Sequence, residues 1–159
     1  MPDEIVLVVN EKPHTVQAGP DTSLIYVLRN ELGLMSPHFG CGDEQCGACM
    51  VLVGAQAKPS CKLLVSEVGR ARITTLEGLT AEGELHPVQR AFIEEQASQC
   101  GYCLNGMIIT TAALLWKNSH PSDRQIREAL DGNLCRCGSH SRILRAVKRA
   151  ETLYSEAES

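Results

Sequence analysis

The eight cysteines of this 159-residue chain form two groups of four, one in each half of the sequence. In the first group the spacing is C-x4-C-x2-C, followed by a fourth cysteine after eleven residues. In the second group a C-x2-C pair is followed, after thirty-one residues, by a C-x-C pair. The groups are Cys41, Cys46, Cys49 and Cys61, and Cys100, Cys103, Cys135 and Cys137. Such grouping favours two metal sites, because in a reducing compartment thiols are more typical as metal ligands than as disulfides.

The first group has the plant-type ferredoxin spacing, in which four thiolates hold a [2Fe–2S] cluster. Three ligands on one short loop require sharp turns, and Gly40, Gly42 and Gly47 supply conformations that residues with a Cβ resist. In the second group Gly101 follows a cysteine in the same way, and Arg136 adds positive charge between two cysteines. We therefore expect one [2Fe–2S] cluster in each half.

Other uses of the cysteines stay open on spacing alone. Four thiolates also suit a tetrahedral zinc ion, although a C-x-C pair crowds two sulfurs on one small ion. Disulfides are the alternative in an oxidising compartment. A Rieske centre needs two histidines in ligand spacing, whereas each half already has four cysteines.

Composition and charge narrow the class of protein to which this chain can belong. Hydrophobic residues make up 43% of the chain, which suffices for one ordinary domain or two small ones. The net charge of −4 disfavours a nucleic-acid binder. Eight of the fifteen basic residues nevertheless lie between Lys117 and Arg149. They predict either the solvated face of the last helices or a surface that meets an anionic cofactor or partner.

Motifs for targeting and for nucleotide binding are missing. The acidic start, Met1–Glu4, does not resemble a secretory signal, and the longest apolar stretch, Met107–Trp116, is too short to cross a bilayer. We expect no transmembrane segment and a cytoplasmic location, with any membrane association through a partner. The patterns G-x-G-x-x-G, G-x-x-x-x-G-K-[ST] and G-x-S-x-G are absent, so the chain is expected to conduct electrons for chemistry that occurs elsewhere.

Hydrophobic patterning predicts a strand-rich first half and a small helical bundle in the second half. The first half is expected to contain strands at residues 5–9, 14–18, 50–53 and 73–76, a turn at 10–13 and a helix at 24–32. A linker is expected at 77–84, followed by helices at 87–98, 106–117, 122–131 and 141–154. Ser122 and Gln125 form a capping box for the third of these helices.

Three motifs carry a resemblance to a known family. They are GCGDEQCGAC at Gly40–Cys49, QCGYC at Gln99–Cys103 and GNLCRCG at Gly132–Gly138. In this order, and over residues 4–154, the sequence resembles the iron–sulfur subunit of the xanthine oxidase family of molybdenum hydroxylases. The resemblance implies an α+β chain. A β-grasp, plant-type [2Fe–2S] ferredoxin domain is expected at residues 1–78, and a four-helix-bundle [2Fe–2S] domain at 85–159.

The resemblance also implies a function in a complex. The chain would dock on a large subunit that carries a molybdopterin cofactor and hydroxylates its substrate with oxygen from water. Electrons would pass to the cluster of the helical domain, then to that of the N-terminal domain, and then to a flavin or a cytochrome. Family likeness gives Gln99 a hydrogen bond to the molybdenum cofactor and places Cys137 beside the pterin. It implies no catalytic residue in this chain.

The substrate is predicted from short segments beside the cysteines. Asn105–Met107 and Ser139–His140 look most like the small subunits of nicotinate dehydrogenases, which implies nicotinate or a related N-heterocycle. Oxidation of an aldehyde or of an isoquinoline-type substrate is the alternative. A zinc-stabilised interaction module and a free-standing two-cluster ferredoxin are the rival classes, distinguished by colour and by co-purification with a larger chain.

Overall fold

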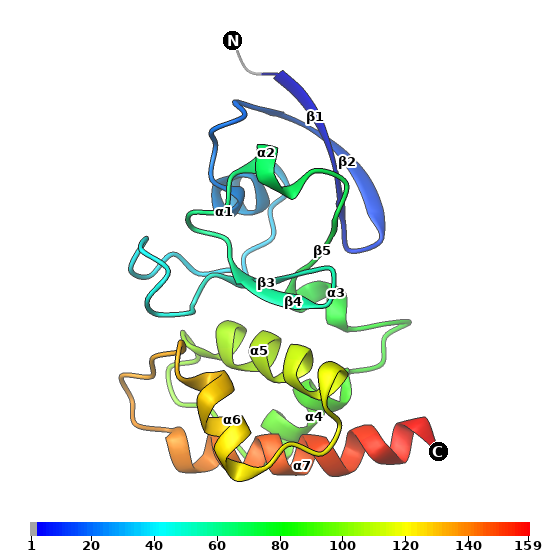
Figure 1. Cartoon of the computed structure of the whole chain (residues 1–159), viewed down its shortest axis with the longest axis vertical. Helices are drawn as coiled ribbons and strands as arrows, with labels where there is room; N and C mark the ends of the chain where they lie inside the picture. Colours follow the sequence, from blue (N-terminus) through cyan, green and yellow to red (C-terminus); the bar gives the residue numbers. More distant parts are fainter. Residues whose placement is uncertain (1–2) are drawn as a thin grey trace.

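The computed structural model describes residues 3–159, so the first two residues of the predicted N-terminal domain lie outside it. A strand-rich half lies against a helical half, with α5 next to the sheet and α7 on the far side (Figure 1). The first half contains β1 (Asp3–Val9), β2 (Lys12–Ala18), α1 (Leu24–Tyr26), the π-helix η1 (Val27–Glu31), β3 (Met50–Val53), β4 (Gln56–Pro59), α2 (Val65–Val68), β5 (Arg72–Thr74) and α3 (Leu76–Leu79). The second half contains α4 (Pro87–Glu94), α5 (Leu104–Lys117), α6 (Asp123–Leu130) and α7 (His140–Glu158).

The sheet has five strands in the order β2-β1-β5-β3-β4. β1 pairs antiparallel with β2, from Asp3 opposite Ala18 to Val9 opposite Lys12, and parallel with β5. The predicted hairpin is confirmed, but its turn is shorter than expected. Asn10 and Glu11 have φ values of 50° and 66°, the left-handed pair that a two-residue turn requires.

The predicted helix after residue 23 is confirmed, and it covers one side of the sheet. Leu24 and Leu28 are fully buried with Leu7 and Ile73 of the strands in one core. From Val27 onward the helix widens into a π-helical turn, closed by the bond from the Leu32 N–H to the Val27 carbonyl at 3.1 Å. This turn leads the chain directly into the loop that carries the first cysteines.

The sequence did not predict β4, α2 or α3, and the linker expected at 77–84 is wrong in its first part. Leu76 and Leu79 form a helical turn there and pack against the core of the helical half. Gly78 lets this turn approach Asn10, since a Cβ would lie 2.0 Å from the Asn10 Oδ1. Packing of Leu76 and Leu79 therefore stabilises a helical turn in a segment whose glycine and acidic residues predict a loop.

The four helices of the second half match the predicted ones except at their ends. α4 ends at Glu94 because Gln96 adopts a φ of 49° and the Ala97 N–H bonds the Phe92 carbonyl at 3.0 Å. The Ser122 capping box of α6 is confirmed. α5 is buried along most of its length, as its apolar sequence predicts. Within residues 3–159 no helix has the length and apolar character needed to cross a membrane.

Candidate metal centres

The first set of thiols lies on the loop between η1 and β3 and on the turn after β4. The Cys41 Sγ accepts hydrogen bonds from the Asp43 and Gln45 N–H groups, both at 3.2 Å. The loop bends sharply because Gly42 and Gly47 have φ values of 66° and 74°. Backbone N–H groups directed at a sulfur stabilise the negative charge of a thiolate.

The second set lies where helices of the second half begin and end. Cys100 and Cys103 precede α5, and Cys135 and Cys137 lie in the segment between α6 and α7. The Tyr102 N–H points at the Cys100 Sγ at 3.5 Å. The helical half therefore brings together two cysteine pairs that are thirty-one residues apart in the sequence.

Within each set the thiols affect one another's pKa. Cys46 acts on Cys41 and Cys61 on Cys49, while Cys100 responds to both Cys137 and Cys135, and Cys103 to both Cys135 and Cys100. No three His, Cys, Asp or Glu side chains among residues 3–159 are arranged to hold one ion together. Four free thiols in each set are the donors that a four-cysteine [2Fe–2S] cluster needs, so the residues present fit that group.

The thiols divide into those that ionise easily and those that do not. For Cys41, burial opposes ionisation but is outweighed by N–H groups of the loop, and the pKa falls to about 7. Burial raises the pKa of Cys49 to about 11 and that of Cys103 to about 12. The Tyr102 N–H lowers the pKa of Cys100. The buried thiols therefore need the positive charge of a metal to become thiolates near neutral pH.

One cavity of about 230 Å³ is bordered by cysteines of both sets. It is lined by Gly40, Cys41, Cys46, Ala48, Cys100, Tyr102, Cys103, Leu134, Cys135 and Arg136. Thiols of both halves thus face the same space, which places the two candidate centres next to each other.

The comparisons with known proteins agree with this arrangement. Residues 7–75 match a family described as 2Fe-2S iron-sulfur cluster binding domain, and residues 75–148 match one described as [2Fe-2S] binding domain. The chain is 53% identical to a nicotinate dehydrogenase subunit of Pseudomonas putida, covering 94% of this chain and 96% of that protein. It is 48% identical to the alpha subunit of isoquinoline 1-oxidoreductase of Brevundimonas diminuta, covering 92% and 96%.

This chain belongs to the iron–sulfur subunits of the xanthine oxidase family of molybdenum hydroxylases. Among solved structures, quinoline 2-oxidoreductase from Pseudomonas putida 86 matches with a TM-score of 0.89 and 32% identity over 97% of both chains. Aldehyde oxidoreductase from Desulfovibrio desulfuricans matches with a TM-score of 0.91 and 36% identity, and this chain spans 17% of its length. Both matched domains bind [2Fe–2S] clusters, so two such clusters are the cofactors of this iron–sulfur subunit, and in its homologues the molybdopterin cofactor is on the large subunit.

The two residues of this subunit predicted to face a partner's molybdenum cofactor, Gln99 and Cys137, lie together at its surface. The Gln99 Nε2 donates a hydrogen bond to the Cys137 carbonyl at 3.2 Å, and the Gln99 side chain is exposed. This bond ties the chain before the first cysteine of the second set to the last cysteine of that set.

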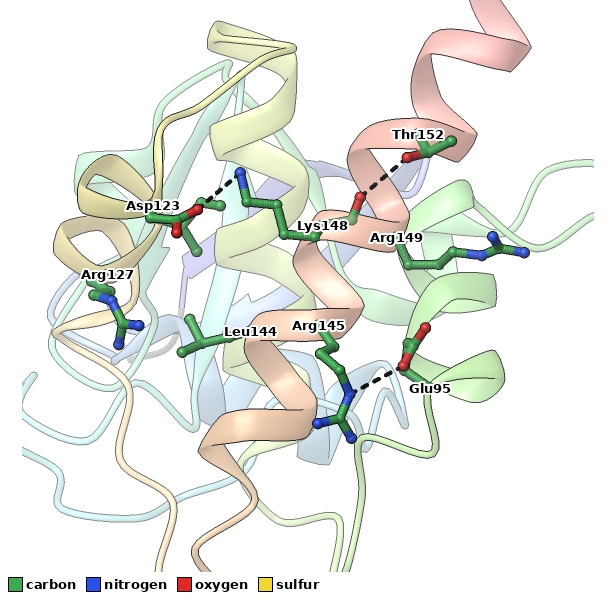
Figure 2. A pocket seen from close by; sticks show the side chains of 9 residues that line it. Glu95, Asp123, Arg127, Leu144, Arg145, Lys148, Arg149 and Thr152 are labelled. Atoms are coloured by element: carbon green, nitrogen blue, oxygen red, sulfur yellow. Dashed lines mark hydrogen bonds and ion pairs between the residues drawn. The ribbon is translucent and has the colours of Figure 1, made fainter.

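Half of the eight basic residues between Lys117 and Arg149 pair with acids, namely Arg124, Arg145, Lys148 and Arg149. Figure 2 shows a hollow between α4, α6 and α7, about 430 Å³ in volume, with two of these pairs on its walls. Lys148 contacts Asp123 at 3.1 Å and Arg145 contacts Glu95 at 3.4 Å. These four pairs agree with a solvated helix face, and an anionic cofactor or partner stays the other interpretation of the region.

Sequence reasoning missed the contacts that join the two halves of the iron–sulfur subunit. The Leu134 N–H bonds the Cys46 carbonyl at 2.9 Å, next to Cys135. The Tyr102 hydroxyl bonds the Phe39 carbonyl, beside the first cysteine loop. Both residues adjoin cysteines of the second set, which is the one signal in the sequence that points to them.

Proposed function

We propose that this chain is the electron-transfer subunit of a molybdenum hydroxylase. It carries electrons from the molybdopterin site of its large partner subunit to an external acceptor, a flavin or a cytochrome. The observation that carries the proposal is one cavity lined by cysteines of both sets, Cys41 and Cys46 of the first and Cys100, Cys103 and Cys135 of the second. A zinc module has no need of two such sets side by side.

All eight cysteines are the proposed iron ligands, four for each cluster. When bound, a [2Fe–2S] cluster supplies a centre that takes up and releases one electron at a time. The chain itself stabilises the negative charge of the cluster's sulfur ligands. The N–H groups of Asp43 and Gln45 at Cys41, and that of Tyr102 at Cys100, stabilise the negative sulfurs.

The helical half is the proposed entry side for electrons. Gln99 and Cys137, which share a hydrogen bond at an exposed position, would face the molybdenum cofactor of the partner subunit. Gln99 would hold that cofactor by a hydrogen bond, and the Cys137 set would receive the electrons before the Cys41 set. The bond from Gln99 to the Cys137 carbonyl supports this assignment, because it orients both residues together.

The proposed substrate is nicotinate or a related N-heterocycle. The 53% identity to the nicotinate dehydrogenase subunit of Pseudomonas putida supports nicotinate. The 48% identity to the alpha subunit of isoquinoline 1-oxidoreductase keeps an isoquinoline-type substrate as the alternative. Because the substrate pocket would belong to the partner, the test is purification of the complex followed by assays on nicotinate, isoquinoline and an aldehyde in parallel.

The finer architecture is also a proposal. We assign a β-grasp domain to residues 1–78, supported by the mixed sheet with its parallel β1–β5 pair and the helix across it. A four-helix-bundle domain is assigned to residues 85–159, supported by the shared core of α4, α5, α6 and α7. A cytoplasmic location, with membrane association only through a partner, suits thiols that must stay reduced.

Metal analysis and electron paramagnetic resonance test the proposal directly. Protein purified with its partner should be red-brown, contain about four irons per chain and show two paramagnetic signals after reduction. Colourless protein with two zinc ions would refute it in favour of an interaction module. Iron-loaded protein that never associates with a larger chain would instead indicate a free-standing ferredoxin.

A further inference from the structure

One buried side chain bonds the helical half to the loop that leads to Cys49. Asn105 is 2% exposed and lies in the first turn of α5, two residues after Cys103. Its Nδ2 donates to the Ala48 carbonyl at 2.8 Å and to the Met50 carbonyl at 2.9 Å. These carbonyls belong to the residues on either side of Cys49, so one amide connects ligand-bearing segments of both sets.

The orientation of this amide is fixed by its partners. Both partners are carbonyl oxygens, which accept hydrogen bonds only, so the NH₂ end of Asn105 must face them. The Oδ1 is buried without a hydrogen-bond partner. An acceptor that is buried without a partner lowers the stability of the fold. The side chain thus keeps its two donors in place at a cost in stability.

Neighbouring contacts hold the same loop at successive residues. A Cβ on Gly106 would lie 2.1 Å from the Gly47 carbonyl oxygen, so the backbone of α5 touches the loop there. The Leu134 N–H bonds the Cys46 carbonyl at 2.9 Å. Cys46, Gly47 and Ala48 are therefore each held by the helical half.

We propose that Asn105 is a positioning residue that fixes the distance and orientation between the two cysteine sets. It acts through the backbone on both sides of Cys49 and touches no iron ligand through its side chain. The inference rests on the proposed function, since its consequence is a fixed separation between the two clusters. Loss of the two Asn105 hydrogen bonds would leave each set intact and alter the distance and orientation between the sets.

The experiment compares Asn105→Leu with Thr111→Val in the complex with the large subunit. Asn105→Leu keeps a side chain of similar size and removes both hydrogen bonds. The Thr111 hydroxyl is also fully buried in α5, but it bonds the Met107 carbonyl of its own helix at 2.7 Å. Thr111→Val therefore removes a buried hydrogen bond from the same helix and leaves the junction unchanged. The junction is the set of contacts between the helical half and the loop at residues 46–50. Iron content, the two paramagnetic signals and the magnetic interaction between the reduced clusters are measured in each protein.

In Asn105→Leu we expect both signals and normal iron content, a changed magnetic interaction and a fall in turnover of about tenfold, as for other lost outer-shell supports. Thr111→Val should keep the wild-type interaction. If Asn105→Leu does not accumulate, Asn105→Ser is measured instead, with the same expected direction because one hydroxyl donor cannot serve two carbonyls. An unchanged interaction at Asn105, or none in the wild type, overturns the inference. Absence of two signals in the wild type contradicts the proposed function instead.

Discussion

A methyl group added at Gly106 tests whether α5 presses on the cysteine loop as the structure indicates. A Cβ there would lie 2.1 Å from the Gly47 carbonyl oxygen and 2.5 Å from the Asn133 Oδ1. The first of these atoms is backbone, so relief requires the loop or the helix to move. Such overpacking costs about 1–3 kcal/mol, occasionally more. Gly→Ala recovers about 0.4–1 kcal/mol by restricting the unfolded chain.

The net loss at Gly106→Ala is therefore about 1–2 kcal/mol. For a chain of this length it lowers the melting temperature by about 2–8 °C. Gly132→Ala is the matched control, because a Cβ there meets nothing within 4 Å and its φ is not left-handed. It should melt at the wild-type temperature or slightly above.

The assay is thermal unfolding of iron-loaded protein at one scan rate, since cluster loss makes unfolding irreversible. Iron content is matched between samples before heating. Equal melting temperatures for the two alanine variants would show that α5 and the loop do not touch at Gly106 and that the junction is not rigid.

Three further predictions concern single side chains. Cys46→Ser should remove one of the two paramagnetic signals of the reduced protein and Cys103→Ser the other; loss of both signals from either variant would contradict separate sites. Gln99→Ala should keep both signals while turnover falls, because a bond to the cofactor is lost without touching iron, and unchanged turnover would make Gln99 an ordinary surface residue. Burial lowers the pKa of His86 from 6.5, and its Nδ1 accepts the Val88 N–H. The stability that neutral His86 contributes is therefore present above pH 6.5. It is lost as the pH falls through the lower pKa that His86 has in the folded protein. His86→Asn, which keeps a cap acceptor, should flatten the decline in melting temperature below pH 6.5, and an equally steep decline would refute this.

Local features of this chain could be predicted from sequence because their causes are local. The β1–β2 hairpin follows from alternating apolar residues, and the α6 start from Ser122 and Gln125, which are three residues apart. The two groups of cysteines were likewise visible as spacing. The short helix at Leu76–Leu79 was not, because its apolar residues find their partners in the other half of the chain.

The junction could not be predicted for the same reason. The hydrogen bond from Asn105 to Ala48 joins residues 57 positions apart, and the sequence shows Asn105 only as the start of an apolar helix. Although Asn105–Met107 also carries a family likeness, nothing in that segment shows that the Asn105 side chain is buried against the other half. Its role follows only from the way the two halves are placed against each other.

The junction also departs from what a chain selected for stability alone would use. It leaves the Asn105 Oδ1 and the Asn133 Oδ1 buried without hydrogen-bond partners. It also brings the backbone of Gly106 against that of Gly47, where neither residue can carry a side chain. Local rules are typically broken where function needs a particular geometry. Because these departures gather on the segments that carry cysteines of both sets, the relative placement of the sets, more than the stability of either half, accounts for them.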